Sequence, residues 1–497
     1  MEELFTPSRV SLGYNSKVMT GMVGLENLGA TCYLNSLLQM LFHLNSFRRA
    51  VYQLPIDADE PSQSTPLALQ SLFVGLQTSE KEVSTKELTR AFGWTSAEAF
   101  MQQDVQEMMR ILIDKLEETV QSYNKRTSSN EQEQQQQQSE TKVQEQHDDV
   151  QANKTHANFI KRMFAGKLKS YIHCVDIAYQ SDRFEDFYDV QLDVKGCRDV
   201  HESFRRYVAI EMLEGDNQYY CEAHGGKFDA KKGVIFSYLP PILTIHLKRF
   251  DFDMQTMNFA KIHDYYEFPT LLCLDDYVER PCGGQTQAEV VVSENTYVLH
   301  SVLVHSGDVG GGHYYAYIRP ATQYNQHCVY NLAFLQRLMR DELTEEDRAY
   351  MNQGCSSQTD QWFKYDDEKV FRVEELEAVH YCYGRKKSTY SFQQQQQHDK
   401  PVVQNALYEF YKQRMQTYEN NINYNSTIMS SAYMLVYIRL QDALEIMKAV
   451  TVEDIPRPLQ EKLHHITQFK AYQSFMQELR DNLIDVYHVT EYELATF

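Results

Sequence analysis

Cys32 stands at the end of a short turn of glycine, alanine and threonine, just before a run whose leucines have helical spacing. The first turn of a helix presents unpaired N–H groups and the positive end of the helix dipole, and both favour a thiolate over a thiol. The thiolate is the nucleophilic form of cysteine. Cys32 is therefore the candidate nucleophile. The alternative interpretation is a small residue buried at a helix start, which describes many free cysteines.

A nucleophilic cysteine needs a base, and the base needs a group that orients it. His313 follows three glycines and begins a run of β-forming residues, so it is the candidate base. A histidine in an ordinary surface turn is the alternative. The acid is expected from Asp366 or Asp367, at the end of a predicted strand. Only one of the two can face the histidine, because adjacent strand residues point to opposite faces; an Asp-Asp pair that marks a turn is the alternative.

An acyl-transfer site also needs hydrogen-bond donors for the developing oxyanion. Asn27 precedes Cys32 on the loop that leads to the nucleophile. Its side-chain amide and the backbone N–H of Cys32 are candidate donors, although asparagine in a glycine-rich loop is also an ordinary turn residue. Each residue alone is a weak signal, but the order asparagine, cysteine, histidine and aspartate together is a stronger one.

The bulk composition excludes several classes of protein. The chain has 497 residues, 42% hydrophobic and 12% aromatic, which is enough to form a core. Its nine widely spaced cysteines are unlike a secreted disulfide framework, and the N-terminus has no signal-peptide pattern. The net charge of −21 disfavours nucleic acid and anionic lipid, and no stretch is apolar enough to cross a bilayer. We expect a nuclear or cytoplasmic protein that binds neither nucleic acid nor membrane.

Helical spacing dominates the front of the chain, and strand alternation dominates the middle and later parts. One helix is expected over residues 32–52 and another from Val105 onward. Strands are expected at residues 188–194, 243–247, 297–305, 313–318, 362–373 and 432–440. This segregation of helices and strands favours an α+β fold.

Three segments interrupt this pattern, at residues 121–156, 321–360 and 390–428. The first is rich in glutamine and acids and has almost no apolar residue, so we expect it to be disordered. The other two each contain a helix-prone piece. The expected organisation is a tail over 1–20, a catalytic domain over 21–440 that carries these insertions, and a helical extension over 441–497.

The segments around the candidate residues resemble the signature boxes of the ubiquitin-specific proteases. Gly24-Leu-Glu-Asn-Leu-Gly-Ala-Thr-Cys32-Tyr-Leu-Asn-Ser36 is similar to the Cys box, and Tyr297–Tyr317 to the His box. Leu239–Phe250 resembles the motif between them. The likeness covers about residues 20–440 apart from the insertions. It implies a papain-like cysteine protease core with a helical thumb, a palm and β-rich fingers.

The resemblance also implies an activity, the hydrolysis of isopeptide or peptide bonds after the C-terminal glycine of ubiquitin. Cys32 would attack that carbonyl and form a thioester. His313 would take the thiol proton and later protonate the leaving amine. Asp366, the first of the acidic pair, would hold the imidazole, with Asp367 as the second choice. Asn27 would stabilise the oxyanion, and no cofactor is implied.

Ubiquitin and ubiquitinated proteins are the partners that the resemblance implies. Asp104 and Glu107 would pair with arginines of the ubiquitin tail; acids on a solvated helix face are the alternative. Aromatic residues would line the channel for that tail, with ordinary core packing as the alternative. These residues are Trp94, Phe250, His305 and Tyr314.

The chain departs from the family pattern in its possible metal ligands. Many members hold zinc on paired CxxC motifs, but here Ile177 follows Cys174 and His224 follows Cys221 at the ligand spacing. Three ligands are too few for a closed structural site, so no zinc is expected. We also expect neither the TRAF-like nor the ubiquitin-like flanking domains of some relatives. Two other functions remain open: a ubiquitin-binding scaffold with little activity, and a protease for another ubiquitin-like modifier.

Overall fold

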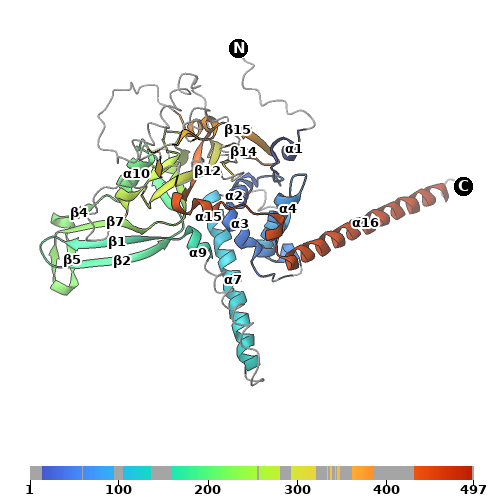
Figure 1. Cartoon of the computed structure of the whole chain (residues 1–497), viewed down its shortest axis with the longest axis horizontal. Helices are drawn as coiled ribbons and strands as arrows, with labels where there is room; N and C mark the ends of the chain where they lie inside the picture. Colours follow the sequence, from blue (N-terminus) through green and yellow to red (C-terminus); the bar gives the residue numbers. More distant parts are fainter. Residues whose placement is uncertain are drawn as a thin grey trace, which may run out of the picture.

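A helical half and a sheet half lie side by side in the computed structural model (Figure 1). The described residues are 14–94, 104–135, 159–279, 293–320, 361–385 and 430–494, without 57, 59, 255, 256 and 310, plus a few isolated positions between 333 and 346. This arrangement confirms the predicted α+β fold. No helix among these residues is both long and apolar enough to cross a membrane.

The front of the chain supplies the helical half. Its helices are α1 (Ser16–Thr20), α2 (Cys32–His43), α3 (Asn45–Tyr52), α4 (Thr65–Thr78), α5 (Lys86–Ala91), α7 (Val105–Gln135) and α9 (Phe159–Phe164). Every residue of α2 is buried. The helix packs against two strands of the sheet, β13 (Gly311–Ile318) and β14 (Trp362–Asp366), as well as against α7. A helix enclosed on all sides is held rigidly, which suits an element that positions a reactive group.

Residues 32–52 form two helices, so the prediction of a single helix is wrong. Leu44 takes an extended conformation between them, with φ −82° and ψ 91°. The side-chain amide of Asn45 donates to the carbonyl of Met447 at 2.9 Å. This contact comes from the far end of the chain, so the spacing of leucines does not reveal the break.

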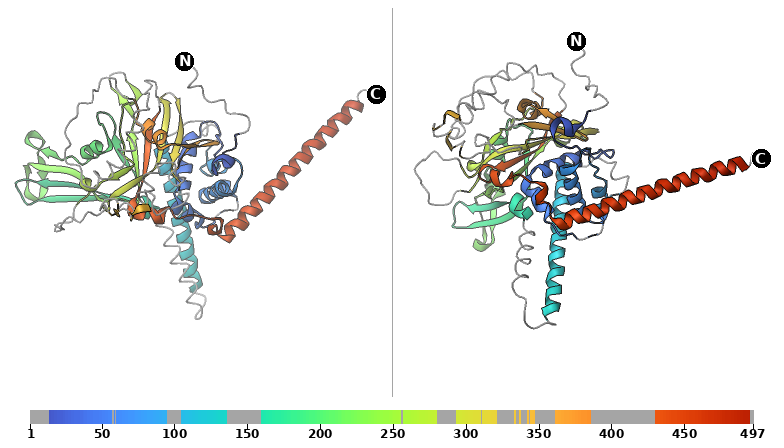
Figure 2. Two further views of the ribbon diagram at one scale, coloured as in Figure 1. Left: turned by 45° about the horizontal axis from the view of Figure 1, so that its top comes forward. Right: turned by 45° about the vertical axis from the view of Figure 1, so that its right-hand side comes forward.

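Helix α7 continues to Gln135 and projects from the body of the molecule (Figures 1 and 2). The prediction of disorder from residue 121 onward is therefore wrong for residues 121–135. Glutamine and glutamate are good helix formers, so a helix that starts on a buried stripe continues into them. The structure does not describe residues 136–158 or the insertion at 390–428. Of the insertion at 321–360, it describes only isolated positions.

In the described part of the chain, eight strands form the central sheet, in the order β15-β14-β13-β12-β16-β8-β3 with β11 beside β12. Its other strands are β3 (Val190–Asp193), β8 (Ile242–Lys248), β11 (Leu271–Cys273), β12 (Thr296–Asp308), β15 (Lys369–Val373) and β16 (Ser430–Arg439). The pairing is antiparallel except for the parallel pair β3 and β8. The predicted strands therefore all lie in this one sheet.

Both faces of the central sheet are buried. Tyr314 and Ala316 pack into the core of the helical half, whereas Tyr315 and Tyr317 pack into a second core on the opposite face. Helix α10 (Val200–Tyr207) contributes to that second core. Because strand residues alternate between faces, β13 connects the two cores and is held from both sides.

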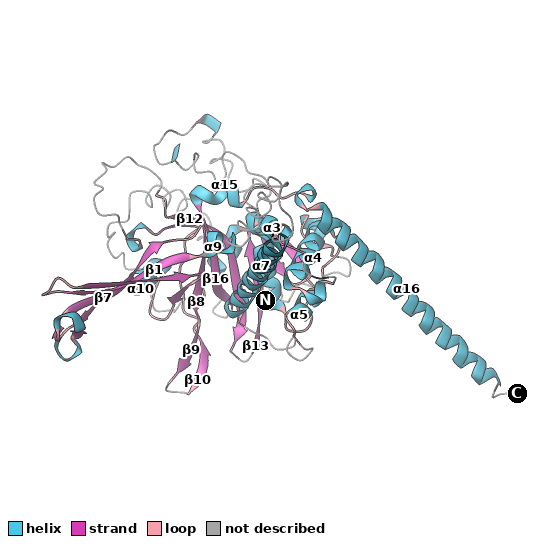
Figure 3. Cartoon of the chain, turned by 90° about the horizontal axis from the view of Figure 1, so that it is seen from below, coloured by secondary structure: helices cyan, strands magenta, loops and turns pink. Residues whose placement is uncertain are grey.

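A second sheet, called here the finger sheet, extends away from the central one (Figure 1). It has the order β2-β1-β7-β4, formed by β1 (Gly166–Cys174), β2 (Gln180–Phe187), β7 (Ala230–Tyr238) and β4 (Glu211–Leu213). Two hairpins stand beside these sheets, one of β5 (Tyr219–Cys221) with β6 (Gly226–Phe228), the other of β9 (Phe250–Asp253) with β10 (Asn258–Lys261). Figure 3 shows the β9–β10 hairpin projecting from the body.

The C-terminal segment is helical, as the sequence predicts. After β16 come the short helix α15 (Ala443–Ile446) and the long helix α16 (Arg457–Leu494). Ile455 and Leu459 join the core of the helical half, while the rest of α16 extends away from it (Figure 2).

Candidate active site

Cys32 is the first residue of α2, and the loop before it is fixed by its own hydrogen bonds. The side-chain carbonyl of Asn27 accepts from the backbone N–H groups of Gly29, at 3.0 Å, and Thr31, at 3.3 Å. The Thr31 hydroxyl accepts from the N–H of Leu28 at 3.0 Å. This turn therefore delivers the cysteine to the helix start in one defined conformation.

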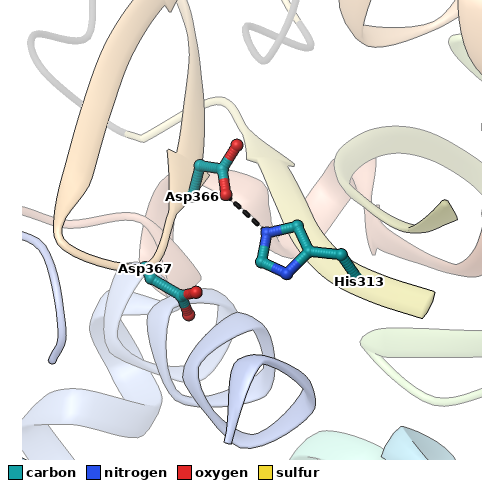
Figure 4. Close-up of side chains that lie close together, drawn as sticks. All are labelled: His313, Asp366 and Asp367. Carbon is teal, nitrogen blue, oxygen red and sulfur yellow. Dashed lines mark hydrogen bonds and ion pairs between the residues drawn. The ribbon is translucent and has the colours of Figure 1, made fainter. Parts of the chain in front are cut away.

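His313 lies near the start of β13, beside the cysteine. The backbone N–H of the next residue, Tyr314, donates to the Cys32 sulfur at 3.4 Å. Hydrogen bonds to Asp366 and then to Cys32 raise the pKa of His313 to about 10. The Nε2 atom of His313 lies 2.6 Å from Oδ1 of Asp366 (Figure 4). Nδ1 is therefore the ring nitrogen that remains for the sulfur. The structure thus brings together three residues that are far apart in the sequence.

Asp366, the first of the acidic pair, faces the imidazole. Burial by itself would raise the pKa of Asp366, but the hydrogen bond from His313 and the ammonium of Lys364 lower it to about 2. The Lys364 Nζ atom lies 2.8 Å from Oδ2 of Asp366. The carboxylate is thus ionised at neutral pH and orients the ring of His313 through its Nε2 atom.

Asp367 lies close to the imidazole but forms its hydrogen bonds with the N-terminal loop and α2. Its carboxylate accepts from the side-chain amides of Asn27, at 2.7 Å, and Asn35, at 2.8 Å. Its φ of 51° lies in the left-handed region, which turns the chain sharply after Asp366. Burial raises the pKa of Asp367, while the two amides oppose that change. Figure 4 shows the hydrogen bond of the imidazole to Asp366, with the Asp367 carboxylate nearby but not bonded to the ring. The two adjacent acids therefore hold different parts of the site.

Four aromatic side chains form a cluster next to the cysteine. Tyr314 lies against His305, with ring centroids 4.7 Å apart, and against Tyr433, at 5.7 Å. Phe250 contacts His305, at 5.3 Å, and Tyr433, at 5.6 Å. Three of the four are predicted substrate-contact residues. Tyr433 was missed as a site residue, because its position in the β-forming run 432–440 gives no functional signal.

Asp104 is connected to this aromatic cluster through Tyr433, whose hydroxyl donates to its carboxylate. The other carboxylate oxygen accepts from the backbone N–H groups of Gln106, at 2.7 Å, and Glu107, at 3.3 Å. Asp104 therefore caps the start of α7. Glu107 is exposed in the first turn of that helix. Asp104 is thus joined to the aromatic cluster, and Glu107 lies in the first turn of the same helix.

Trp94 packs on Phe92 after helix α5, with ring centroids 5.3 Å apart. Both side chains are partly buried against the core of the helical half. Residues 95–103, which connect Trp94 to Asp104, lie outside the described part of the chain. This is the placement of a core aromatic residue, and a role of Trp94 toward substrate stays a prediction.

The family model described as "Ubiquitin carboxyl-terminal hydrolase" matches residues 23–437. The chain belongs to this family. The match spans the Cys32 loop, both sheets and the strand that carries His313.

Curated relatives agree with the family assignment. The chain is 39% identical over 90% of its length to ubiquitin C-terminal hydrolase 12 of Arabidopsis thaliana, and 36% identical over 90% to ubiquitin carboxyl-terminal hydrolase 15 of Saccharomyces cerevisiae. It is 35% identical over 90% to ubiquitin carboxyl-terminal hydrolase 7 of Drosophila melanogaster, which is consistent with a resemblance to the herpesvirus-associated ubiquitin-specific protease. The chain covers 32%, 29% and 30% of these three relatives, about a third of their length.

A solved structure shares the fold. It is entitled "Structure of the SAGA Ubp8/Sgf11/Sus1/Sgf73 DUB module bound to ubiquitin aldehyde". The match has a TM-score of 0.53 at 19% identity and covers 84% of this chain and 69% of that one. The fold is therefore that of the papain-like ubiquitin-specific protease core, as the sequence predicts.

The cysteines considered as metal ligands are Cys174, at the end of β1 in the finger sheet, and Cys221, in the β5–β6 hairpin. The Cys221 sulfur lies 3.5 Å from Nδ1 of His224. Among the described residues, three possible ligand atoms come within 4.8 Å of one another only at His313, Asp366 and Asp367. Both acids already accept hydrogen bonds from side chains: Asp366 from His313, and Asp367 from Asn27 and Asn35. These bonds orient the imidazole and the N-terminal loop, which accounts for the close grouping of the three residues.

Asn35 is a site residue that the sequence analysis missed. Its amide donates to Asp367 at 2.8 Å and to the carbonyl of Glu26 at 3.2 Å. The sequence did contain a sign of this role, because Asn35 follows Cys32 by one helical turn and lies on the same face of α2. A polar residue at that spacing on an otherwise apolar buried helix needs a polar partner.

Gly24 is required where the N-terminal loop crosses the turn that carries the two acids. A Cβ atom at Gly24 would lie 2.2 Å from the Glu368 carbonyl oxygen and 2.6 Å from that of Asp367. We expect Gly24→Ala to displace this turn and lower the free energy of unfolding by about 1–3 kcal/mol, the usual range for overpacking. Thermal and urea unfolding would measure the change.

Gly75→Ala is the matched control for that substitution. The nearest atoms to a Cβ atom there belong to the side chain of Val83, at 3.1 Å, and Gly75 lies inside helix α4, where alanine is favoured. We expect its free energy of unfolding to change by less than about 1 kcal/mol. Equal stability of Gly24→Ala and the parent chain would contradict the close approach seen in the structure.

Proposed function

We propose that this chain is the catalytic region of a deubiquitinase, a thiol hydrolase that cleaves the isopeptide or peptide bond after the C-terminal glycine of ubiquitin. The observation that supports this most is the convergence of Cys32, His313 and Asp366 in a member of the ubiquitin carboxyl-terminal hydrolase family. The proposed substrates are ubiquitinated proteins.

In the proposed acylation step, the Cys32 thiolate attacks the carbonyl carbon of the terminal glycine of ubiquitin. His313 has taken the thiol proton and is held as an imidazolium by Asp366, at 2.6 Å. The tetrahedral intermediate collapses as the carbon–nitrogen bond breaks, and His313 gives its proton to the leaving amine. A thioester between ubiquitin and Cys32 remains.

In the proposed deacylation step, water attacks the thioester while neutral His313 accepts the proton from that water. The carbon–sulfur bond then breaks, which releases the C-terminal carboxylic acid of ubiquitin and returns the thiolate–imidazolium pair. The released acid loses its proton to solvent and becomes the carboxylate. The backbone N–H of Cys32 and the amide of Asn27 are proposed as donors to the oxyanion in both steps. Asp367 holds the Asn27 amide at 2.7 Å, so its proposed role is to position this donor.

We propose that the C-terminal tail of ubiquitin reaches Cys32 past the aromatic cluster. Tyr314 and His305 lie next to the cysteine and would form one wall for the two glycines of the tail. Asp104 and Glu107, at the start of α7, are the proposed partners of the arginines that precede them. Trp94 and Phe250 are proposed as further contacts.

The proposed location is the nucleus or the cytoplasm. The reason is chemical: a reaction that uses the Cys32 thiolate requires a reducing compartment, in which thiols persist.

Hydrolysis of ubiquitin with a fluorophore on its C-terminal carboxyl group tests the proposal. We expect the purified chain to release the fluorophore with saturation kinetics, and to act more weakly on the same fluorophore attached to other ubiquitin-like modifiers. Binding of ubiquitin without release would support the scaffold alternative instead. Faster release from another modifier would support that modifier as the substrate.

The pH dependence of this hydrolysis reports on the imidazolium. The pKa of His313 is raised to about 10, and the hydrogen bond to Asp366 is the first cause. The imidazolium that protonates the leaving amine is lost only as pH rises through that value. We expect Asp366→Asn to lower the pKa of His313, to move the alkaline limb of kcat/KM to lower pH, and to reduce the rate roughly 100-fold.

Asp367→Asn is the matched comparison, because that carboxylate contacts Asn27 and Asn35 instead of the ring. It should lower the rate with a smaller shift of the alkaline limb. The exposed Glu445→Gln, on α15, is the control for loss of one surface charge. If Asp366→Asn left the limb in place and Asp367→Asn moved it, the two acids would have the opposite assignment.

A further inference from the structure

A buried lysine lies beneath the strand end that faces the candidate base. Lys261 is the last residue of β10, and only 7% of its surface is exposed. Its ammonium donates to Nδ1 of His305 and to the carbonyl of His305, both at 2.8 Å, and to the carbonyl of Gly307 at 2.9 Å. A charge removed from water is costly unless it is hydrogen-bonded, so these three contacts hold the amine in one position.

The acceptors of Lys261 lie on the strand segment directly opposite His313. In the antiparallel pair β12–β13, Ser306 pairs with His313 and Gly307 pairs with Gly312. The ammonium therefore binds the carbonyls on either side of the residue that pairs with the base. It reaches them from the β9–β10 hairpin, a separate element of the chain (Figure 3).

His305 completes the connection between Lys261 and the base. An ammonium only donates, so Nδ1 of His305 accepts and the neutral ring carries its proton on Nε2. Burial and then the charge of Lys261 lower the pKa of His305 to about 4, which keeps the ring neutral. A Cβ atom on Gly312 would lie 2.3 Å from Nε2 of His305. The imidazole therefore supports the backbone immediately before His313.

We propose that Lys261 is a positioning residue for the base. Its ammonium fixes the end of β12 and the ring of His305, and through them the place of His313 relative to Cys32 and Asp366. The inference rests on the proposed function for the role of His313 as a base. It goes beyond that function because Lys261 itself does not touch the reacting atoms.

Lys261→Met removes the charge and all three donors while keeping an unbranched side chain. We expect kcat for the ubiquitin fluorophore to fall about 10- to 100-fold, as for a small displacement of a catalytic group, with KM changed by less than about threefold. Lys261→Gln has an amide that can donate to some of the three acceptors of Lys261, so it should give an intermediate kcat. It also guards against poor folding of the methionine variant.

Alkylation of Cys32 by iodoacetamide, without ubiquitin, provides a readout that is independent of the proposed activity. The rate depends on the thiolate that His313 stabilises, so Lys261→Met should slow it and shift its pH profile. Lys169→Met is the matched control, because Lys169 is a second buried lysine, 9% exposed, that binds Asp182 and Glu279 in the finger region. We expect that variant to lose stability and to keep the alkylation profile of the parent chain.

The two possible failures are distinguishable. A parent chain that alkylates normally at Cys32 but releases no fluorophore contradicts the proposed function, while the alkylation profiles still test Lys261. Folded Lys261→Met and Lys261→Gln with the parent kcat and the parent alkylation profile would overturn the positioning role. A lower melting temperature alone, with those two readouts unchanged, would also overturn it.

Discussion

Cys32→Ala is expected to reduce the release of fluorophore from ubiquitin by at least about 10⁴-fold, because no other group can form the thioester. Alanine fills most of the space of the cysteine at the start of α2, where Cys32 is 4% exposed, so the fold should persist. Steady-state kinetics would measure the loss, and thermal unfolding would show that the variant is folded.

Cys197→Ala is the matched control for that substitution. Cys197 is buried to a similar degree, at 5% exposed, and it lies in the core on the opposite face of the central sheet. It should retain the activity of the parent chain within about twofold, since surroundings that lack reactive groups tolerate this change. If Cys32→Ala kept the parent rate, the assignment of the nucleophile would be wrong.

His313→Ala is expected to lower kcat by about 10³- to 10⁴-fold, because both proton transfers and the thiolate partner are lost. The same variant should slow the alkylation of Cys32 near neutral pH, since the imidazolium no longer stabilises the thiolate. The ring has the exposure needed for this role, with 39% of its side-chain surface accessible.

The finger sheet supplies a matched control for the histidine. His173 also contacts an aspartate, with its Nε2 atom 3.2 Å from Asp182, and its side chain is 38% exposed. His173→Ala therefore removes a His–Asp pair of similar exposure that lies in the finger sheet, on β1 and β2. Its kcat should match that of the parent chain. Equal losses in His313→Ala and His173→Ala would show that the effect is not specific to the candidate site.

The sequence predicted the fold class, and the three residues that it singled out as nucleophile, base and acid lie together in the structure, for physical reasons. Cys32 and His313 stand beside glycine-bearing loops, and such loops are recognisable without a structure. The rule that adjacent strand residues face opposite ways anticipated that only one acid meets the imidazole. It did not show what the other acid does, since that depends on Asn35 and on the left-handed turn at Asp367.

Other features depend on contacts between distant segments, which periodicity does not record. The break between α2 and α3 is held by a contact of Asn45 with Met447. Tyr433 reaches Asp104 across 329 positions of sequence, and Asp104 caps a helix as well as facing the cluster. Lys261 is one of many lysines by composition, and only its burial beneath β12 sets it apart.

The central claim is that the Cys32 sulfur, paired with the His313 imidazole, is the atom that attacks the end of ubiquitin. Ubiquitin that carries an electrophile in place of its terminal carboxylate tests this most directly, with the product identified by intact mass and peptide mapping. The expected result is one covalently added ubiquitin, attached at Cys32 and missing from Cys32→Ala. An adduct at another cysteine, or a folded parent chain that forms none, would contradict the account.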